Sequence, residues 1–182
     1  MGTYEKYIDN YTIANKLRRW IWNITCLLFF RPFSLPIFNV WRNFVLSMFG
    51  AKIGSGSIVY STCKIWAPWN LEIGQRTCIG PYVIVYNPGK ITLKNKVAIS
   101  QYAYLCTATH DYTSSKHTLY WKNIVIDDYA WVAARAFISP GVHIGERAVI
   151  GACAVLTKDA EAWGVYAGNP AKLIKKRILK DE

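Results

Sequence analysis

The sequence lacks any apolar run long enough to cross a lipid bilayer. Its main apolar stretch, from Trp20 to Phe30, is stopped by Arg31 and Pro32, whereas a membrane-spanning helix needs about 18 or more apolar residues. No secretory signal peptide is expected, because the first ten residues are polar and include two acids. These absences predict a cytoplasmic protein.

Cysteine pairs and metal-binding patterns are missing as well. The five cysteines are odd in number and form no C-x-x-C pair, which is typical of packed thiols in a reducing compartment. The three histidines, His110, His117 and His143, include no pair five residues apart. Because zinc-binding histidines often stand at such a short spacing, no metal is expected.

Acidic residues are scarce: 11 of them stand against 22 Lys and Arg, which gives a formal net charge of +11. Such a charge suits nucleic acid, an anionic membrane surface or a phosphate-rich small ligand. The basic residues are spread out except for a cluster near the end, and no common nucleic-acid-binding module is recognisable. Nucleic acid is therefore not the expected partner.

A six-residue repeat is present through the middle of the chain. Ile, Val or Leu recurs every sixth residue, and the side chain four positions later is nearly always small. Neither a helix nor an ordinary strand has this period, which predicts a short-repeat β-helix and hence an all-β solenoid. The aliphatic positions are Ile53, Val59, Ile65, Ile73, Ile79, Val85, Leu93, Ile99, Leu105, Ile126, Val132, Ile138, Ile144, Ile150 and Leu156.

The repeat is interrupted at regular places. Two extra residues follow the third repeat and again the sixth, and a long insertion up to Val125 follows the ninth. Since three repeats make one turn of a triangular coil, all these interruptions fall at one corner. Insertions stacked on one edge of a solenoid are where such folds usually place their binding site. His110, the last residue before the insertion, is therefore a candidate for chemistry.

The N-terminal 50 residues are predicted to form an arm and a helical cap over the first coil, whose backbone would otherwise be an unpaired edge. Residues 35–49 predict an amphipathic helix that Gly50 ends. For the stretch from Trp20 to Phe30 two interpretations stay open. It is either a helix buried against the solenoid or a segment in peripheral contact with the inner face of the membrane, since Trp flanked by Arg suits an interface. The apolar stripe of the second helix consists of Ile37, Trp41, Phe44 and Met48.

The solenoid is expected over residues 51–162, with an inserted loop at 111–125. Residues 163–182 are expected to form a loop and a short C-terminal helix. Asn169 and Pro170 suit the N-cap and first position of that helix, which would run from Ala171 to Leu179.

Several stretches resemble one family, the hexapeptide-repeat acyltransferases. The pattern Ile-Gly-x-x-small-x occurs at residues 73–78 and 144–149. Residues 108–111, Ala-Thr-His-Asp, are similar to the Asn-His-Asp or Ser-His-Asp segment of the maltose, galactoside and Nod-factor acetyltransferases, and residues 149–159 resemble their Val-Ile-Gly-Ala-Gly-Ser-Val-Val-Thr-Lys-Asp run. The aromatic N-terminal region looks most like the colanic-acid-type O-acetyltransferases of exopolysaccharide biosynthesis.

The resemblance implies a left-handed parallel β-helix, a homotrimer with active sites between subunits, and acetyl-CoA as the acyl donor. Small residues would let the pantetheine arm approach the backbone, and lysines would act as point charges for phosphate. A structural role at an interface stays open for the tryptophan, and a solvated helix face for the two C-terminal lysines. The donor-binding residues implied are Trp131, Ala134, Ala152, Thr157, Lys158, Lys172 and Lys175.

Acyl transfer to a sugar needs a base, because a hydroxyl is a poor nucleophile at neutral pH. Histidine suits this task, since its unperturbed pKa is about 6.5, and His110 stands in the Thr-His-Asp context. Asp111 either orients the imidazole, as the carboxylate does in triads, or caps the loop. Candidates for contact with the acceptor are Tyr82, Asn87, Tyr104 and His117.

The predicted function is acetyl-CoA-dependent O-acetylation of a saccharide hydroxyl in polysaccharide biosynthesis, with a lipid-linked precursor as the expected acceptor. N-acylation of an amino-sugar or nucleotide-sugar stays open, because an amine acceptor also tends to need a base. A γ-type carbonic anhydrase shares this fold but needs three zinc-binding histidines, two of them five residues apart. No such pair occurs here. A non-catalytic solenoid is disfavoured by the Thr-His-Asp insertion and the basic tail.

Overall fold

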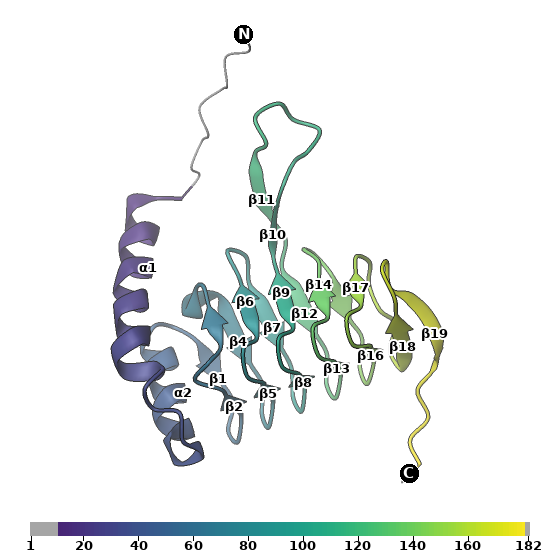
Figure 1. The fold of residues 1–182 in the computed structure, drawn as a ribbon, viewed down its shortest axis with the longest axis horizontal. Coiled ribbons are helices and arrows are strands. Elements are labelled where there is room, and N and C mark those ends of the chain that lie inside the picture. Colours follow the sequence, from purple (N-terminus) through teal and green to yellow (C-terminus); the bar gives the residue numbers. More distant parts are fainter. Residues whose placement is uncertain (1–10, 181–182) are drawn as a thin grey trace.

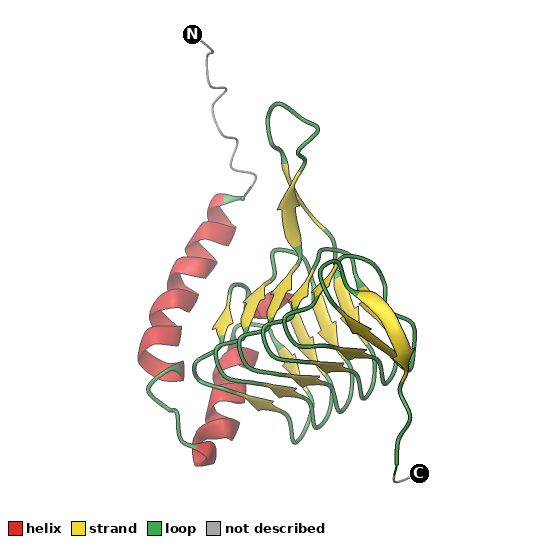
Figure 2. Cartoon of the chain, turned by 45° about the vertical axis from the view of Figure 1, so that its right-hand side comes forward, coloured by secondary structure: helices red, strands yellow, loops and turns green. Residues whose placement is uncertain are grey.

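The structure is a computed structural model that describes residues 11–180. Its body is a stack of triangular coils, with two helices covering one end and a hairpin projecting from one side (Figure 1, Figure 2). Residues 1–10 of the predicted N-terminal arm and residues 181–182 of the predicted C-terminal segment lie outside the described part.

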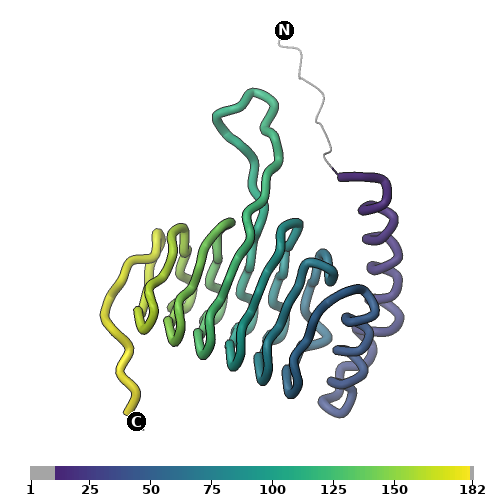
Figure 3. Tube along the Cα trace, turned by 180° about the vertical axis from the view of Figure 1, so that it is seen from behind, coloured from purple at the N-terminus to yellow at the C-terminus, as the bar shows by residue number. Residues whose placement is uncertain are grey.

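Three sheets form the sides of the stack, and their strands are parallel except for β19. The coils follow one another along the stack (Figure 3). Sheet A contains β1 (Lys52–Ile53), β4 (Leu71–Ile73), β7 (Ile91–Leu93), β12 (Ile124–Ile126) and β15 (His143–Ile144). Sheet B contains β2 (Ile58–Val59), β5 (Cys78–Ile79), β8 (Ala98–Ile99), β13 (Trp131–Val132), β16 (Val149–Ile150), β18 (Gly164–Ala167) and β19 (Lys172–Lys176). Sheet C contains β3 (Lys64–Ile65), β6 (Ile84–Tyr86), β9 (Tyr104–Cys106), β14 (Phe137–Ile138) and β17 (Val155–Leu156). The left-handed parallel β-helix predicted from the repeat and the resemblance is confirmed.

The aliphatic positions of the repeat fill the interior. Side chains alternate between the two faces of a strand, so one residue of each short strand points inward. Ile79, Ile99, Val132 and Ile150 are register partners in successive coils of sheet B, and none is more than 2% exposed. Every predicted aliphatic position is buried except Ile53, which is partly buried beneath the helices.

The glycine of the Ile-Gly pattern is required by the spacing of the coils. A Cβ atom added to Gly74 would lie 2.6 Å from the carbonyl carbon of Lys94, and one added to Gly145 would lie 2.5 Å from the backbone nitrogen of Ala162. Side chains do not tolerate such contacts, so only glycine lets the next coil's backbone come this close.

The cysteines are all free. Cys63 occupies a small-residue position of the repeat and is fully buried. Burial raises the pKa of its thiol to about 12, so the thiol stays protonated and acts as a packing group. Cys26 and Cys106 are also buried, whereas Cys153 is exposed at a corner, so the prediction that the cysteines are packed is wrong for Cys153.

Two helical segments cover the first coil. They comprise α1 (Ile13–Thr25), which continues as a π-helix η1 (Cys26–Phe30), and α2 (Asn39–Met48), which follows the short 3-10 helix η2 (Pro36–Phe38). Trp22 attaches α1 to the solenoid, because its ring Nε1 donates to the carbonyl of Ile65 at 2.7 Å. None of the helices in residues 11–180 combines the length and the apolarity that a membrane crossing requires.

The buried face of α2 is not the one predicted. Ile37 and Met48 of the expected stripe are 76% and 69% exposed, whereas Arg42, Val45 and Leu46 are buried. The Arg42 guanidinium donates to the carbonyls of Val59 in the first coil and of Phe33 and Leu35 in the preceding loop. The end of a β-helix presents carbonyls that need donors, and this requirement overrides the apolar periodicity.

The stretch from Trp20 to Phe30 fits neither sequence interpretation alone. Trp22, Cys26 and Phe30 are buried against the solenoid. Trp20 and Leu28, on the other side of the same helix, are 62% and 54% exposed. One stripe is therefore a packing surface, and the other is a large apolar surface open to solvent.

The prediction of a C-terminal helix is wrong. Residues 172–176 form β19, which runs antiparallel to β18 and pairs Lys172 with Ala167 and Lys175 with Val165. Leu173 and Ile174, expected to face inward, are 46% and 62% exposed. The last coil leaves an open sheet edge, and pairing that edge outweighs the helical periodicity of so short a segment.

The insertion is a β-hairpin of β10 (Ala108–His110) and β11 (Leu119–Trp121). It begins before His110, so His110 and Thr109 lie on the hairpin and not in the last coil position predicted for them. The coil resumes at Ile124, since Ile124 and Val125 already pair with Ile91 and Thr92, two residues before the predicted restart.

Two adjacent residues of β12 test which side chains point into the core. Ile126 is fully buried, whereas Val125 faces outward from sheet A and is half-buried. We expect Ile126→Ala to lower the free energy of unfolding by about 2–5 kcal/mol, because it leaves a cavity. Val125→Ala should lower it by less than about 1 kcal/mol, since little buried surface is lost. Urea denaturation measures both, and equal losses would contradict the assigned directions.

Candidate functional site

The hairpin carries the candidate base away from the body of the coils (Figure 1). β10 leaves the corner between sheets C and A, and its register with β11 places His110 opposite Leu119. The side chain of His110 is exposed, and Leu119 beside it is buried. The hairpin therefore presents the imidazole to the surroundings of the solenoid.

The imidazole of His110 is held by a backbone carbonyl. Its Nδ1 lies 2.6 Å from the carbonyl oxygen of His117. Because a carbonyl only accepts hydrogen bonds, Nδ1 carries the proton in the neutral ring and the lone pair lies on Nε2. Such a ring can accept a proton through Nε2 while its orientation stays fixed. The sequence predicted His117 as an acceptor contact, whereas the structure uses its carbonyl to position His110.

Asp111 caps the hairpin loop. Its Oδ1 accepts hydrogen bonds from the backbone N–H of Thr113 at 2.9 Å and from the Thr113 hydroxyl at 2.6 Å. These bonds, the hydroxyl's first, hold the pKa of Asp111 below its usual value. Of the two roles left open by the sequence, the structure shows the loop cap.

His143 lies on the outer face of sheet A in an ionic cluster. Its Nε2 is 2.8 Å from Oδ2 of Asp127, whose other oxygen is 2.8 Å from Nζ of Lys94. Partial burial pulls the pKa of Asp127 upward, but the bonds from Lys94 and His143 outweigh it and hold the pKa below its usual value. Within residues 11–180, no group of three or more His, Cys, Asp or Glu side chains is placed to hold a metal ion.

The residues implied for donor binding lie in three places. Ala134 and Ala152 are at the corner between sheets B and C, where the N–H of Cys153 donates to the carbonyl of Ala134. Trp131 is on the outer face of sheet B, 43% exposed, with its ring N–H on the Ser100 hydroxyl at 2.9 Å.

The remaining implied donor contacts lie farther along the chain. Thr157 and Lys158 follow β17 at the next corner, across sheet C. Lys172 and Lys175 are on β19 at the end of the stack. A single chain therefore does not bring all these residues together.

The residues predicted to contact a sugar also lie in different places. Tyr82 is exposed at the corner between sheets B and C, and Tyr104 is half-buried on the outer face of sheet C. Asn87 is fully buried, and its side-chain amide bonds to the N–H and carbonyl of Ala67. Asn87 is thus a structural residue, because no part of it is open to a ligand.

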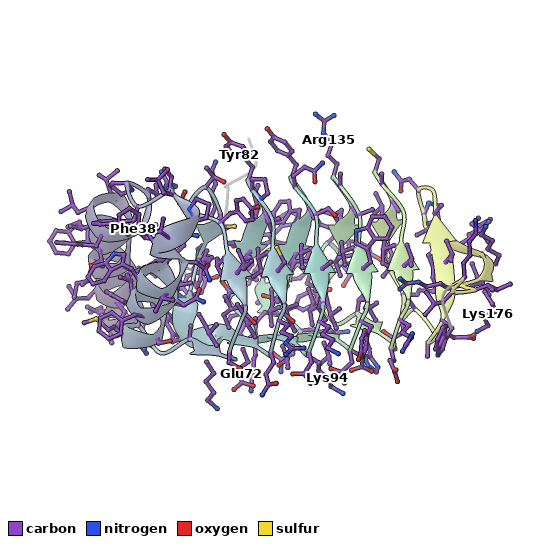
Figure 4. The ribbon with its side chains drawn as sticks, turned by 90° about the horizontal axis from the view of Figure 1, so that it is seen from below. Phe38, Glu72, Tyr82, Lys94, Arg135 and Lys176 are labelled. Atoms are coloured by element: carbon purple, nitrogen blue, oxygen red, sulfur yellow. The ribbon has the colours of Figure 1, made fainter. Side chains whose placement is uncertain are left out.

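Two residues near Tyr82 were missed by the sequence analysis. The ring of Tyr102 stacks on Tyr82 with 5.0 Å between centroids, and the guanidinium of Arg135 lies 5.7 Å from the Tyr102 ring. Figure 4 shows Tyr82 and Arg135 projecting from the same edge. The signal in the sequence was the recurrence of Tyr at equivalent turn positions, 82 and 102.

The outer faces of the three sheets differ in polarity. Sheet A is ionic, with the pairs Lys52–Glu72, Lys90–Glu72 and Lys94–Asp127 all at 2.8 Å, and Glu72 and Lys94 lie on the side opposite Tyr82 (Figure 4). The outward residues of sheets B and C are mostly apolar. Those of sheet B are Ile58, Cys78, Ala98, Trp131 and Val149, and those of sheet C beyond Lys64 are Ile84, Tyr104, Phe137 and Val155.

Known proteins resemble this chain in sequence and fold. Residues 123–158 match the family "Bacterial transferase hexapeptide (six repeats)". The chain is 38% identical over 165 residues to "Putative colanic acid biosynthesis acetyltransferase WcaF" of Escherichia coli (strain K12), which covers 91% of this chain and 89% of that protein.

Solved structures show the same architecture. A maltose O-acetyltransferase from Clostridium difficile 630 has a TM-score of 0.80 and 25% identity, covering 92% of this chain and 90% of that one. A galactoside acetyltransferase in complex with coenzyme A has a TM-score of 0.82 and 22% identity, covering 93% and 85%. The second likeness shows a shared fold.

The hydrogen bonds of two histidines predict opposite neutral tautomers in one protein. His110 should carry its proton on Nδ1, because Nδ1 faces a carbonyl, and His143 should carry it on Nε2, because Nε2 faces a carboxylate. Long-range ¹H–¹⁵N correlation spectra of the imidazole rings distinguish the two forms. If His110 is protonated on Nε2 when neutral, the proposed holding of the ring by His117 is wrong.

Proposed function

Since the chain belongs to the hexapeptide-repeat family of bacterial transferases and is an acetyltransferase, we propose that it transfers an acetyl group from acetyl-CoA to a saccharide hydroxyl. The relative from Escherichia coli acts, by its name, in colanic acid biosynthesis, which supports a role in polysaccharide biosynthesis. The observation that carries the proposal is the His110 imidazole, fixed by the His117 carbonyl with its lone pair on Nε2.

His110 is the general base in this proposal. Nε2 removes the proton from the acceptor hydroxyl as the oxygen attacks the acyl carbon, and later returns that proton to the departing thiolate sulfur. The Nδ1 bond to His117 stabilises the positively charged ring that exists between these two transfers. Asp111 acts through the loop, because its bonds to Thr113 fix the turn between His110 and His117. Acetyl-CoA supplies the activated thioester.

The chain contains groups that fit acetyl-CoA. Ala134 and Ala152 leave space for a chain against the backbone, and Trp131 on sheet B offers an exposed ring. Lys158, Lys172 and Lys175 are exposed and form no ion pair in residues 11–180. Lysines in this state suit the phosphates of the donor, and Thr157 stands next to Lys158.

A homotrimer with active sites between subunits brings these groups together. The face of sheet A is ionic and suits water, whereas sheet B and the later strands of sheet C, β9, β14 and β17, present apolar residues that favour contact with another copy. The donor contacts on sheet B of one subunit would then face the C–A corner of its neighbour, where Lys158 and the hairpin lie. Tyr82, Tyr104 and His117 remain candidates for the acceptor side of such a groove.

The activity test pairs two histidines. His110→Ala should lower kcat by about 10²–10⁴-fold, the range expected for loss of a general base, while coenzyme A binding and the oligomeric state stay unchanged. His143→Ala is the matched control and should retain most activity, because His143 lies on the ionic face of sheet A. A loss below about tenfold for His110→Ala would show that another group is the base.

The acceptor is identified with the same assay, in which free thiol is released from acetyl-CoA. A panel of neutral saccharides is compared with amino-sugars and nucleotide-sugars. Turnover of the neutral saccharides supports O-transfer, and turnover of amines alone would replace it with N-acylation.

The helical end supports a further part of the proposal, peripheral contact with the inner face of the membrane by a cytoplasmic enzyme. Trp20, Leu27, Leu28 and Phe29 are 49–62% exposed, and the side chains around Phe38 project away from the coils (Figure 4). No Asp or Glu occurs in residues 11–71, which contain seven Lys and Arg. An apolar surface with only positive charge nearby fits an anionic bilayer.

Vesicle flotation tests this contact. The wild type should float with vesicles of phosphatidylglycerol and phosphatidylcholine, because Trp20 and Phe29 enter the interface. The double variant Trp20→Ser, Phe29→Ser should stay in the lower fractions, whereas Tyr112→Ser, which removes an 87% exposed ring from the hairpin loop, should float like the wild type. Equal flotation of all three proteins would contradict the assigned surface.

A further inference from the structure

Two neighbouring clefts lie where the N-terminal helices meet sheet C. The larger has a volume of about 410 Å³ and the smaller about 210 Å³. Arg31 and Lys64 line both clefts, so the two clefts adjoin with two cations at the junction. The larger volume lies within the roughly 300–1,000 Å³ of ordinary small-molecule sites.

The larger cleft has mostly apolar walls. Trp22, Cys26 and Leu27 line it from α1 and η1, Ile84 lines it from sheet C, and Trp66 lines it from the residue after β3. The hydrogen bond from Trp22 to the carbonyl of Ile65 fixes the two walls relative to each other. Such a cleft suits a hydrocarbon chain, because it provides apolar contact on both sides.

The smaller cleft is lined by hydroxyl groups. Ser61, Thr62 and Tyr82 join Arg31 and Lys64 around it. Hydroxyls beside two cations suit a polar head group that carries negative charge and hydrogen-bonding oxygens.

The two cations at the junction have no carboxylate partner. Neither Arg31 nor Lys64 forms an ion pair within residues 11–180. Burial raises the pKa of the Cys26 thiol, against the opposing effect of Arg31, so the nearby sulfur stays neutral and does not balance the charge. The site therefore complements an anion.

The backbone at this junction is also unusual. Residues 26–30 form a π-helix, in which the N–H of Arg31 donates to the carbonyl of Cys26 at 2.9 Å. π-helical turns are rare in proteins, and those that do occur are often found at functional sites. Arg31, which lines both clefts, directly follows this turn.

We propose that this site binds a phosphorylated amphiphile, with its apolar chain in the larger cleft, its phosphate on Arg31 and Lys64, and its polar head toward Ser61, Thr62 and Tyr82. If the proposed acetyl transfer to saccharides holds, this is the binding site for the lipid-linked acceptor that the sequence already predicted, held through its phosphate. The same chemistry occurs in membrane phospholipids, so the ligands of the test must separate the two sources.

Calorimetric titration of the full chain, without acetyl-CoA, tests the site. The probes are farnesyl phosphate, farnesol and inorganic phosphate, below any micelle-forming concentration. Farnesyl phosphate should bind more tightly than either fragment. The double variant Arg31→Gln, Lys64→Gln should weaken it by about tenfold or more, as expected for lost charge-assisted hydrogen bonds, and should leave farnesol binding unchanged.

Lys116→Gln on the exposed hairpin loop is the matched control and should bind farnesyl phosphate like the wild type. The proposal is overturned if the double variant binds farnesyl phosphate unchanged, if inorganic phosphate binds as tightly as farnesyl phosphate, or if no saturable binding occurs. Lysophosphatidylglycerol then separates the sources. Tighter binding of farnesyl phosphate assigns an isoprenoid-linked ligand, and tighter binding of lysophosphatidylglycerol assigns a membrane lipid.

Acetyl transfer to soluble saccharides separates this inference from the proposed function. If the protein transfers acetyl groups but does not bind the amphiphile, only the proposed binding site is wrong. If it binds the amphiphile but transfers no acetyl group, only the proposed acetyl transfer is wrong. Circular dichroism of the double variant checks its fold, which Arg31 and Lys64 should not affect because both side chains are exposed.

Discussion

The backbone hydrogen bonds between successive coils are the constraint on which the structure depends. Each short strand pairs only with the strands of the coils before and after it, so an interior coil is satisfied by its neighbours and an end coil is not. The first coil is completed by side-chain donors of α2, with Arg42 on the carbonyl of Val59. The last is completed by β19, which pairs with β18. Both ends therefore use segments that the repeat itself does not specify.

The same constraint explains why the candidate base lies outside the solenoid. An insertion within a side would break the register of a sheet, whereas an insertion at a corner leaves the sheets intact. The hairpin pairs with itself, Ala108 opposite Trp121 and His110 opposite Leu119, and so needs no strand of the coil. It can then hold His110 through the His117 carbonyl at a fixed distance from the sides of the stack.

Three kinds of outer surface follow from one regular core. Sheet A carries a network of ion pairs, sheets B and C carry apolar side chains, and the helical end combines exposed aromatics with positive charge. The interior is nearly the same in every coil, so the outward residue of each strand is free to specify the surroundings. Water, a second copy and a lipid surface are the environments that these three chemistries suit.

The period of six by itself determined the solenoid and its core, because only inward aliphatic residues and small corner residues satisfy closely stacked coils. Ile79, Ile99 and Val132 were assigned to the interior from spacing alone, and the position of His110 beside an insertion at one corner followed from the interruptions of the repeat. The tertiary structure decided what local periodicity does not contain. Residues 172–176 became a strand because an open edge lay beside them, and the apolar stripe of α2 stayed outside because carbonyls of the first coil required Arg42. The burial of Asn87, the cap formed by Asp111, the His117 carbonyl on His110 and the shared cleft at Arg31 and Lys64 likewise depend on residues distant in sequence or on loop geometry, which the order of the residues alone does not specify.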